Sequence, residues 1–84
     1  MTAMTVQLTV KLYGTLEQWV PGYNPETGCA VHLAAQSTVA DLIDHLGVPT
    51  RSVGIVSVNG QAAKKADVLP DQALVKVFHP IFGG

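Results

Sequence analysis

From Val6 to Leu12 every second residue is apolar, and the residues between them are polar. A period of two places the apolar side chains on one face of an extended segment, so the pattern predicts a strand with one buried face. The stretch from Tyr13 to Gly28 contains Pro-Gly, Asn-Pro and Thr-Gly pairs, which mark turns. Within it, Thr15–Trp19 is expected to form a short turn of helix. A second strand is expected at Cys29–Leu33, and it could pair with the first, although the connection is long for a hairpin.

The period changes to a helical one after Ser37 and Thr38, either of which can cap a helix. One helix face carries Val39, Leu42, Ile43 and Leu46, and Asp41 in the first turn complements the helix dipole. Gly47 is a natural C-terminal stop. The pattern predicts an amphipathic helix that packs on a neighbouring layer.

The rest of the chain predicts three more extended segments. A strand is expected at Val53–Val58, followed by the tight-turn pair Asn59-Gly60. A short edge strand is expected at Gln61–Lys65, and Leu69–Asp71 is typical of a turn. The last strand is expected at Leu74–Phe78. One helix across a mixed sheet of four to five strands is a two-layer α+β domain.

The outer face of the last strand carries apolar side chains. Val75 and Val77 are expected to face the core, which turns Leu74, Lys76 and Phe78 outward. These outward residues could form part of a docking face, or sheet twist or an oligomer could bury them.

Composition and charge narrow the function classes. The chain has 84 residues, 48% of them hydrophobic and 13% charged, which suits one domain with a compact core. The formal net charge is −1 and the basic residues are scattered, so we expect no nucleic-acid partner. No segment is apolar for long enough to span a membrane, and no signal peptide is apparent, so a cytoplasmic protein is expected.

The side chains offer no catalytic constellation. The three histidines fall in separate predicted elements, and Cys29 with His32 supplies only two metal ligands. No phosphate-binding glycine loop and no serine or cysteine nucleophile motif is present. We therefore expect no enzyme activity, no metal site and no bound cofactor.

The C-terminal residues carry the candidate chemistry. Pro80 cannot continue a sheet ladder, so we expect a domain at residues 1–79 and a flexible tail at residues 80–84. Without side chains, Gly83 and Gly84 could enter a narrow channel, and a terminal glycine carboxylate is open to adenylation. The residues before them form an apolar approach that suits a partner groove: Phe78, Pro80, Ile81 and Phe82.

These segments together resemble the MoaD/ThiS family of ubiquitin-like sulfur carriers, which have the β-grasp fold. The resemblance is carried by Val58-Asn59-Gly60, the turn at Leu69-Pro70-Asp71, the strand Leu74–Phe78 and the ending His79–Gly84. The Phe-x-Pro-Ile-x-Gly-Gly ending is nearer to the small subunit of molybdopterin synthase than to the thiamine carrier. The remainder of the chain matches as an order of elements.

The resemblance implies a mechanism and partners. A ubiquitin-activating-type enzyme uses ATP to adenylate Gly84, and a sulfur donor converts the adenylate to a thiocarboxylate for delivery to a sulfur-accepting synthase subunit. It also implies roles for the neighbouring residues: access for Gly83, tail guidance for Pro80, Ile81 and Phe82, and docking for Phe78. The acceptor pathway stays open among molybdopterin, tungstopterin, thiamine, tRNA thiolation and cysteine synthesis. The alternatives are a modifier joined to target lysines through Gly84 and a non-catalytic interaction module.

One segment departs from the family pattern. The connection at 15–28 is rich in proline and glycine and contains Trp19 and Tyr23. We expect these two aromatic side chains to cover one end of the core, and an additional recognition surface is the alternative.

Overall fold

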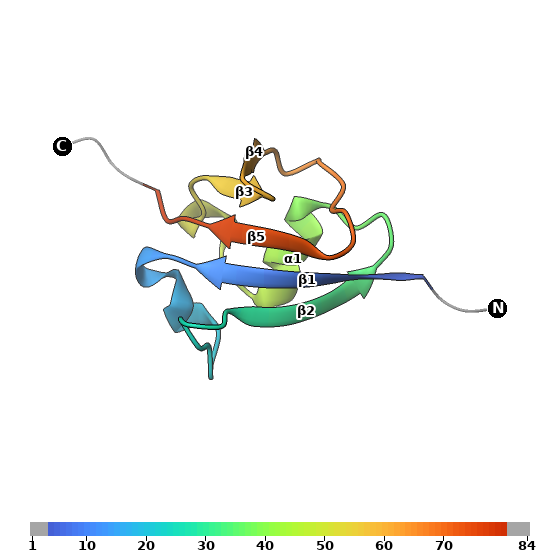
Figure 1. The fold of residues 1–84 in the computed structure, drawn as a ribbon. Helices are drawn as coiled ribbons and strands as arrows, with labels where there is room; N and C mark the ends of the chain where they lie inside the picture. Colours follow the sequence, from blue (N-terminus) through green and yellow to red (C-terminus); the bar gives the residue numbers. More distant parts are fainter. Residues whose placement is uncertain (1–3, 81–84) are drawn as a thin grey trace.

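The computed structural model describes residues 4–80, in which one helix lies across one face of a five-stranded sheet (Figure 1). In chain order the elements are β1 (Thr5–Leu12), the 3₁₀ helix η1 (Gly14–Trp19), β2 (Cys29–Ala34), α1 (Val39–Leu46), the 3₁₀ helix η2 (Thr50–Ser52), β3 (Val56–Val58), β4 (Gln61–Ala63) and β5 (Ala73–Val77). The predicted α+β architecture with one main helix is confirmed. No helix within residues 4–80 is long and apolar enough to cross a membrane.

The strand order in the sheet is β2-β1-β5-β3-β4. β1 pairs antiparallel with β2 across the long connection and parallel with β5, whereas β3 pairs antiparallel with both β5 and β4. The first and last strands are therefore neighbours in the middle of the sheet. This arrangement brings the C-terminal end of β5 beside the C-terminal end of β1.

The core lies between the inner sheet face and α1. The inward residues of β1 alternate with exposed or half-buried ones, as the period of two predicts. Together with the apolar side of α1 they form one cluster of buried residues: Val6, Leu8, Val10, Leu12, Leu16, Val31, Val39, Leu42, Ile43, Val48, Val56, Leu69, Ala73, Val75 and Val77.

α1 begins after Thr38 and ends before Gly47, as the sequence predicts. The Thr38 hydroxyl accepts from the Asp41 backbone N–H at 3.3 Å, and the Asp41 carboxylate accepts from the Thr38 N–H at 2.9 Å. This reciprocal capping box satisfies two donors that the first turn cannot pair internally. Gly47 ends the helix in the left-handed region, with φ 76°.

The Asn59-Gly60 turn joins β3 to β4 with both residues at positive φ, 51° and 85°, as a tight hairpin turn requires. β3 is shorter than predicted, because only Val56–Val58 form a regular ladder. Before it, η2 turns the chain, and Gly54 and Ile55 bond irregularly to Phe78 near the end of β5.

The connection from η1 to β2 closes one end of the core. Tyr23 packs against the core cluster, and its hydroxyl accepts from the Leu12 N–H at 2.7 Å. Trp19 leaves 39% of its surface exposed and lies outside this cluster. The expectation of a core-covering role is confirmed for Tyr23 and stays a prediction for Trp19. The short turn of helix predicted in this connection is present as η1.

Candidate functional site

The end of β5 carries the candidate site. Val75 and Val77 are buried, whereas Leu74 is exposed and Lys76 and Phe78 are half-buried on the outer face, as predicted. The chain then continues through His79, which is exposed, to Pro80, the last residue that the structure describes.

Four predicted site residues lie outside the described residues: Ile81, Phe82, Gly83 and Gly84. Their roles in tail guidance and sulfur transfer therefore stay predictions. The same holds for the proposed division of the chain into a domain at 1–79 and a tail at 80–84.

Phe78 stacks on Tyr13, with ring centroids 4.7 Å apart and planes at 12°. The backbone holds both rings in place, because Tyr13 N–H donates to Val77 C=O at 3.0 Å and Phe78 N–H donates to Ile55 C=O at 2.9 Å. Ile55, beside Phe78, leaves 62% of its surface exposed. An aromatic pair and an aliphatic side chain thus form an apolar surface where β5 ends.

Two lysines lie beside this apolar surface. The parallel register of β1 and β5 pairs Lys11 with Lys76, and Ser57 of β3 lies on the other side of Lys76. The paired positions bring two positive charges to the outer face of the sheet, beside the aromatic pair. We call the whole surface the exit face, and it comprises Lys11, Tyr13, Ile55, Leu74, Lys76 and Phe78.

Shallow hollows flank His79 and Pro80 on two sides. One is lined by Gly54, Ile55 and Phe78 and has a volume of about 460 Å³. The other is lined by Thr15, Arg51 and Ser52 and has a volume of about 420 Å³. The chain therefore leaves the domain between two depressions, one of them beside the apolar part of the exit face.

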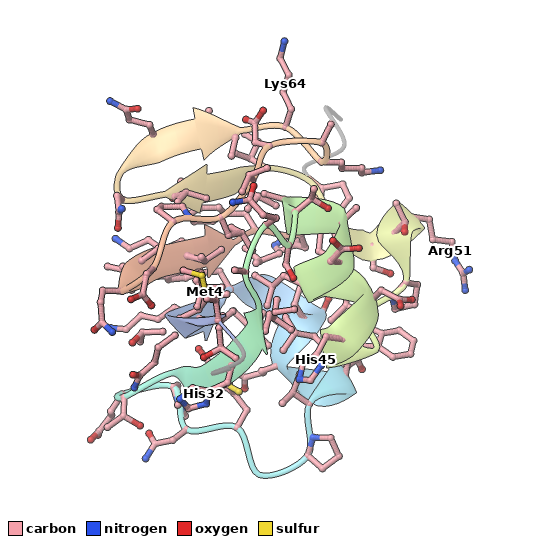
Figure 2. All side chains as sticks on the ribbon, turned by 90° about the vertical axis from the view of Figure 1, so that its right-hand side faces the viewer. Met4, His32, His45, Arg51 and Lys64 are labelled. Atoms are coloured by element: carbon pink, nitrogen blue, oxygen red, sulfur yellow. The ribbon has the colours of Figure 1, made fainter. Side chains whose placement is uncertain are left out.

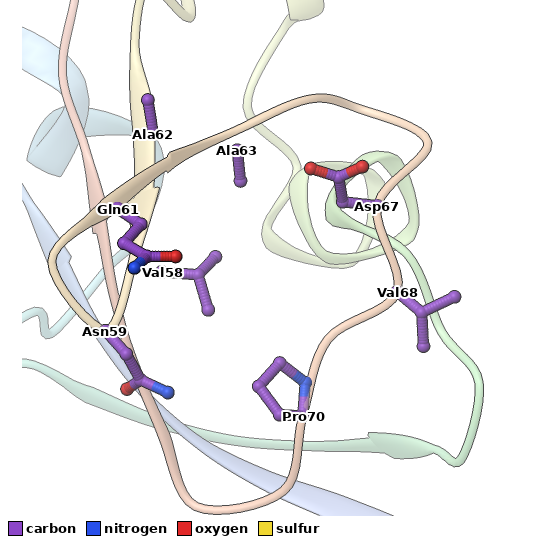
Figure 3. Close-up of a pocket in the computed structure, with 8 residues that line it drawn as sticks. All are labelled: Val58, Asn59, Gln61, Ala62, Ala63, Asp67, Val68 and Pro70. Atoms are coloured by element: carbon purple, nitrogen blue, oxygen red, sulfur yellow. The ribbon is translucent and has the colours of Figure 1, made fainter.

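Another hollow, of about 430 Å³, lies under the β3–β4 hairpin at the opposite end of β5 (Figure 3). Two of its polar side chains already accept hydrogen bonds from the backbone. The Asn59 side-chain oxygen accepts from the Leu74 N–H at 2.9 Å, and the Asp67 carboxylate accepts from the Lys64 N–H at 2.8 Å. These two acceptors stabilise the local turns, so we assign the hollow no chemistry.

Within residues 4–80, the His, Cys, Asp and Glu side chains form no cluster of metal-binding size. Figure 2 shows His32 and His45, which lie on β2 and α1 respectively. Cys29 is a free, half-buried thiol. Among residues 4–80, no three His, Cys, Asp or Glu side chains come close enough together to hold a metal ion.

Sequence reasoning found Phe78, Leu74 and Lys76 on the outer face but missed three of their neighbours. Lys11, Tyr13 and Ile55 reach this surface only through the β1–β5 and β3–β5 pairings. The single available signal was the continuation of the β1 alternation, which turns Lys11 and Tyr13 outward while Leu12 points inward.

Comparisons with known proteins agree with this architecture. The family model described as Mut7-C ubiquitin matches residues 5–83. No curated protein sequence matches significantly.

Three solved structures share the fold. The small archaeal modifier protein 1 of Haloferax volcanii superposes with a TM-score of 0.70 at 19% identity, covering 90% of this chain and 99% of that one. The HVO 2177 protein of the same organism gives 0.74 at 24% identity, covering 95% of this chain and 88% of that one. A putative molybdopterin converting factor, subunit 1, from Pyrococcus furiosus superposes with a TM-score of 0.70 at 21% identity. The match covers 90% of this chain and 99% of that one. The predicted ubiquitin-like β-grasp fold is confirmed.

Proposed function

Because the chain belongs to the Mut7-C ubiquitin family, we propose that it is a ubiquitin-like sulfur carrier that works through the carboxylate of Gly84. The carboxylate attacks the α-phosphate of ATP on an adenylating enzyme and releases pyrophosphate. A donor of sulfide-level sulfur then attacks the acyl carbon of the adenylate, the bond to AMP breaks, AMP leaves, and a thiocarboxylate remains. The carrier itself supplies the reacting group and a docking surface, and the partner supplies catalysis.

One observation carries the proposal: the central strand β5 ends beside a partly exposed aromatic pair and leads directly into the segment that ends in Gly83 and Gly84. The strand is held on both sides, by β1 and β3, so it gives the departing chain a rigid base. Glycines at the reacting end admit the carboxylate to a narrow site. The relationship in fold to a putative molybdopterin converting factor subunit supports a sulfur-transfer role of the molybdopterin type.

The exit face is the proposed docking surface. Tyr13, Phe78 and Ile55 supply apolar area, and Lys11 and Lys76 supply positive charge beside it. A complementary partner surface presents apolar side chains next to carboxylates. The adenylating enzyme and the sulfur-accepting synthase subunit would use this surface in turn, because both must receive the same tail.

The test is the intact mass of the protein made together with an adenylating enzyme and its sulfur donor. We expect one oxygen to be replaced by sulfur at Gly84, and a variant lacking Gly84 to stay unmodified. The mass of the protein made alone verifies that Gly84 carries the free carboxylate. If the complete system leaves the mass unchanged, the proposed function is wrong.

A modifier function is the second candidate, favoured by the relationship in fold to a protein described as a small archaeal modifier. It begins with the same adenylation and ends with an amide bond to a lysine of a target protein. Denaturing purification of the tagged chain from cells would then yield higher-mass conjugates that disappear when Gly83 and Gly84 are deleted. Thiocarboxylate without conjugates separates the carrier from the modifier.

A further inference from the structure

The backbone just before the tail is held from one side by the segment before β3. We call Phe78, His79 and Pro80 the tail root. Gly54 N–H donates to Phe78 C=O at 2.7 Å, and Phe78 N–H donates to Ile55 C=O at 2.9 Å. These two bonds extend the β3–β5 pairing beyond its regular ladder, up to the last residues before the tail.

Gly54 lies against the tail root more closely than any side chain would allow. A Cβ atom at this position would lie 2.8 Å from the Cα of Pro80 and 2.9 Å from the carbonyl carbon and oxygen of His79. All three atoms belong to the backbone, so they cannot rotate away. The φ of Gly54 lies outside the left-handed region, so close approach, and not a special backbone conformation, demands glycine here.

Gly14, at the start of η1, lies against the other side of the tail root. A Cβ atom there would overlap the imidazole ring of His79. This ring is exposed, so it can move aside, and the Gly14 contact is softer than the Gly54 contact. The tail root therefore passes between two glycines, one against its backbone and one against a side chain.

We propose that Gly54, assisted by Gly14, is a positioning residue that sets the direction in which the tail leaves the domain. This inference rests on the proposed function, since direction matters only if Gly84 must reach a partner's active site. The four residues after Pro80 span at most about 14 Å when extended. With so short a reach, a change of direction at the root shifts the region that the carboxylate can reach, and a misplacement of about 1 Å at a reacting centre can cost about a hundredfold in rate.

The first experiment measures the contact itself. The Gly54→Ala variant is compared with Gly60→Ala, whose new methyl group meets no atom within 4 Å but is strained by a φ of 85°. Amide hydrogen exchange is followed at Phe78, with Val75 in the middle of β5 as the internal reference. We expect exchange at Phe78, relative to Val75, to accelerate about tenfold in Gly54→Ala and to stay unchanged in Gly60→Ala. Unchanged protection in both variants overturns the proposal.

The second experiment measures activation. We expect kcat/KM for thiocarboxylation to fall about tenfold to a hundredfold in Gly54→Ala, and to stay near the wild-type value in Gly60→Ala although that variant is also destabilised. Equal activation of the two variants overturns the proposal. If the wild-type chain is not thiocarboxylated at all, the proposed function fails, whereas the exchange measurement still decides whether Gly54 holds the tail root.

If Gly54→Ala does not fold, a pair of variants at the Gly14 contact tests the proposal instead. Gly14→Ala introduces strain at a φ of 70° and also displaces the His79 ring. The double variant Gly14→Ala/His79→Ala keeps the strain but removes the ring. We expect the double variant to recover activation without recovering stability to urea. If it is activated no better than Gly14→Ala alone, the proposed role of Gly14 is wrong.

Discussion

Replacing Ile55 by Ala tests the exit face at its most exposed apolar residue. The substitution removes three carbon atoms, worth about 2.4 kcal/mol when they are fully buried. Because Ile55 leaves 62% of its surface exposed in the free protein, a partner that covers it gains about 1.5 kcal/mol. We therefore expect the dissociation constant for the adenylating enzyme to rise about tenfold.

The matched control is Val68→Ala. Val68 is also an exposed β-branched residue, with 52% of its surface accessible, but it lies beside the hollow at the opposite end of β5. Both variants should lose about 1 kcal/mol or less of unfolding free energy, because only the already covered part of each side chain contributes to folding. Urea denaturation measures this stability, and isothermal titration calorimetry measures partner binding.

The comparison separates docking from folding. The exit face predicts weaker binding for Ile55→Ala and unchanged binding for Val68→Ala at similar stability. If both variants bind the partner as tightly as the wild type, Ile55 is not covered in the complex, and the assignment of the exit face as the docking surface is refuted.

Three further predictions concern charge and stability. Reversing both Lys11 and Lys76 to Glu should slow association with the adenylating enzyme about tenfold at low salt and much less at high salt; Lys64→Glu serves as the control in the same stopped-flow measurement. Thr38→Ala should lower the free energy of unfolding by about 1 kcal/mol, because α1 loses its hydroxyl cap, and Thr38→Ser should restore most of it in urea denaturation. Tyr23→Phe should cost about 1 kcal/mol in the same assay, because a partly buried backbone N–H of β1 loses its acceptor; a value near zero would show that water replaces the hydroxyl.

Most of the fold follows from local patterns, because strands and helices differ in period. The alternation of apolar and polar residues in β1, and the apolar face and capping residues of α1, can be recognised in the sequence. Each of these patterns is determined by residues close together in the chain. The short length of β3 was not predicted, because it depends on the pairing with β5, in which Gly54 and Ile55 bond to Phe78 outside the regular register. Trp19 and Tyr23 were expected to cover one end of the core, and how far each side chain does so depends on how the connection from η1 turns.

The candidate site divides in the same way. Phe78 could be placed on the outer face from the alternation of the last strand. Its stacking partner Tyr13 and the pairing of Lys11 with Lys76 depend on the parallel register between the first and last strands, which no local pattern specifies. Gly54 carried no signal in the sequence, because its ordinary backbone conformation marks no turn and only its neighbour in space reveals its role.

The central position of β5 in the sheet has a consequence for folding during synthesis. The strand that fills the middle of the sheet is the last of the five in chain order, so β1 and β3 have no partner between them until β5 has been synthesised. Pairing of the two ends of the chain also requires closure of a long loop, which slows folding. A chain that stops before β5 lacks its sheet centre and should remain open to proteolysis. Folding therefore requires β5, the strand that leads to the tail, so partners that recognise the folded exit face select chains that include this strand.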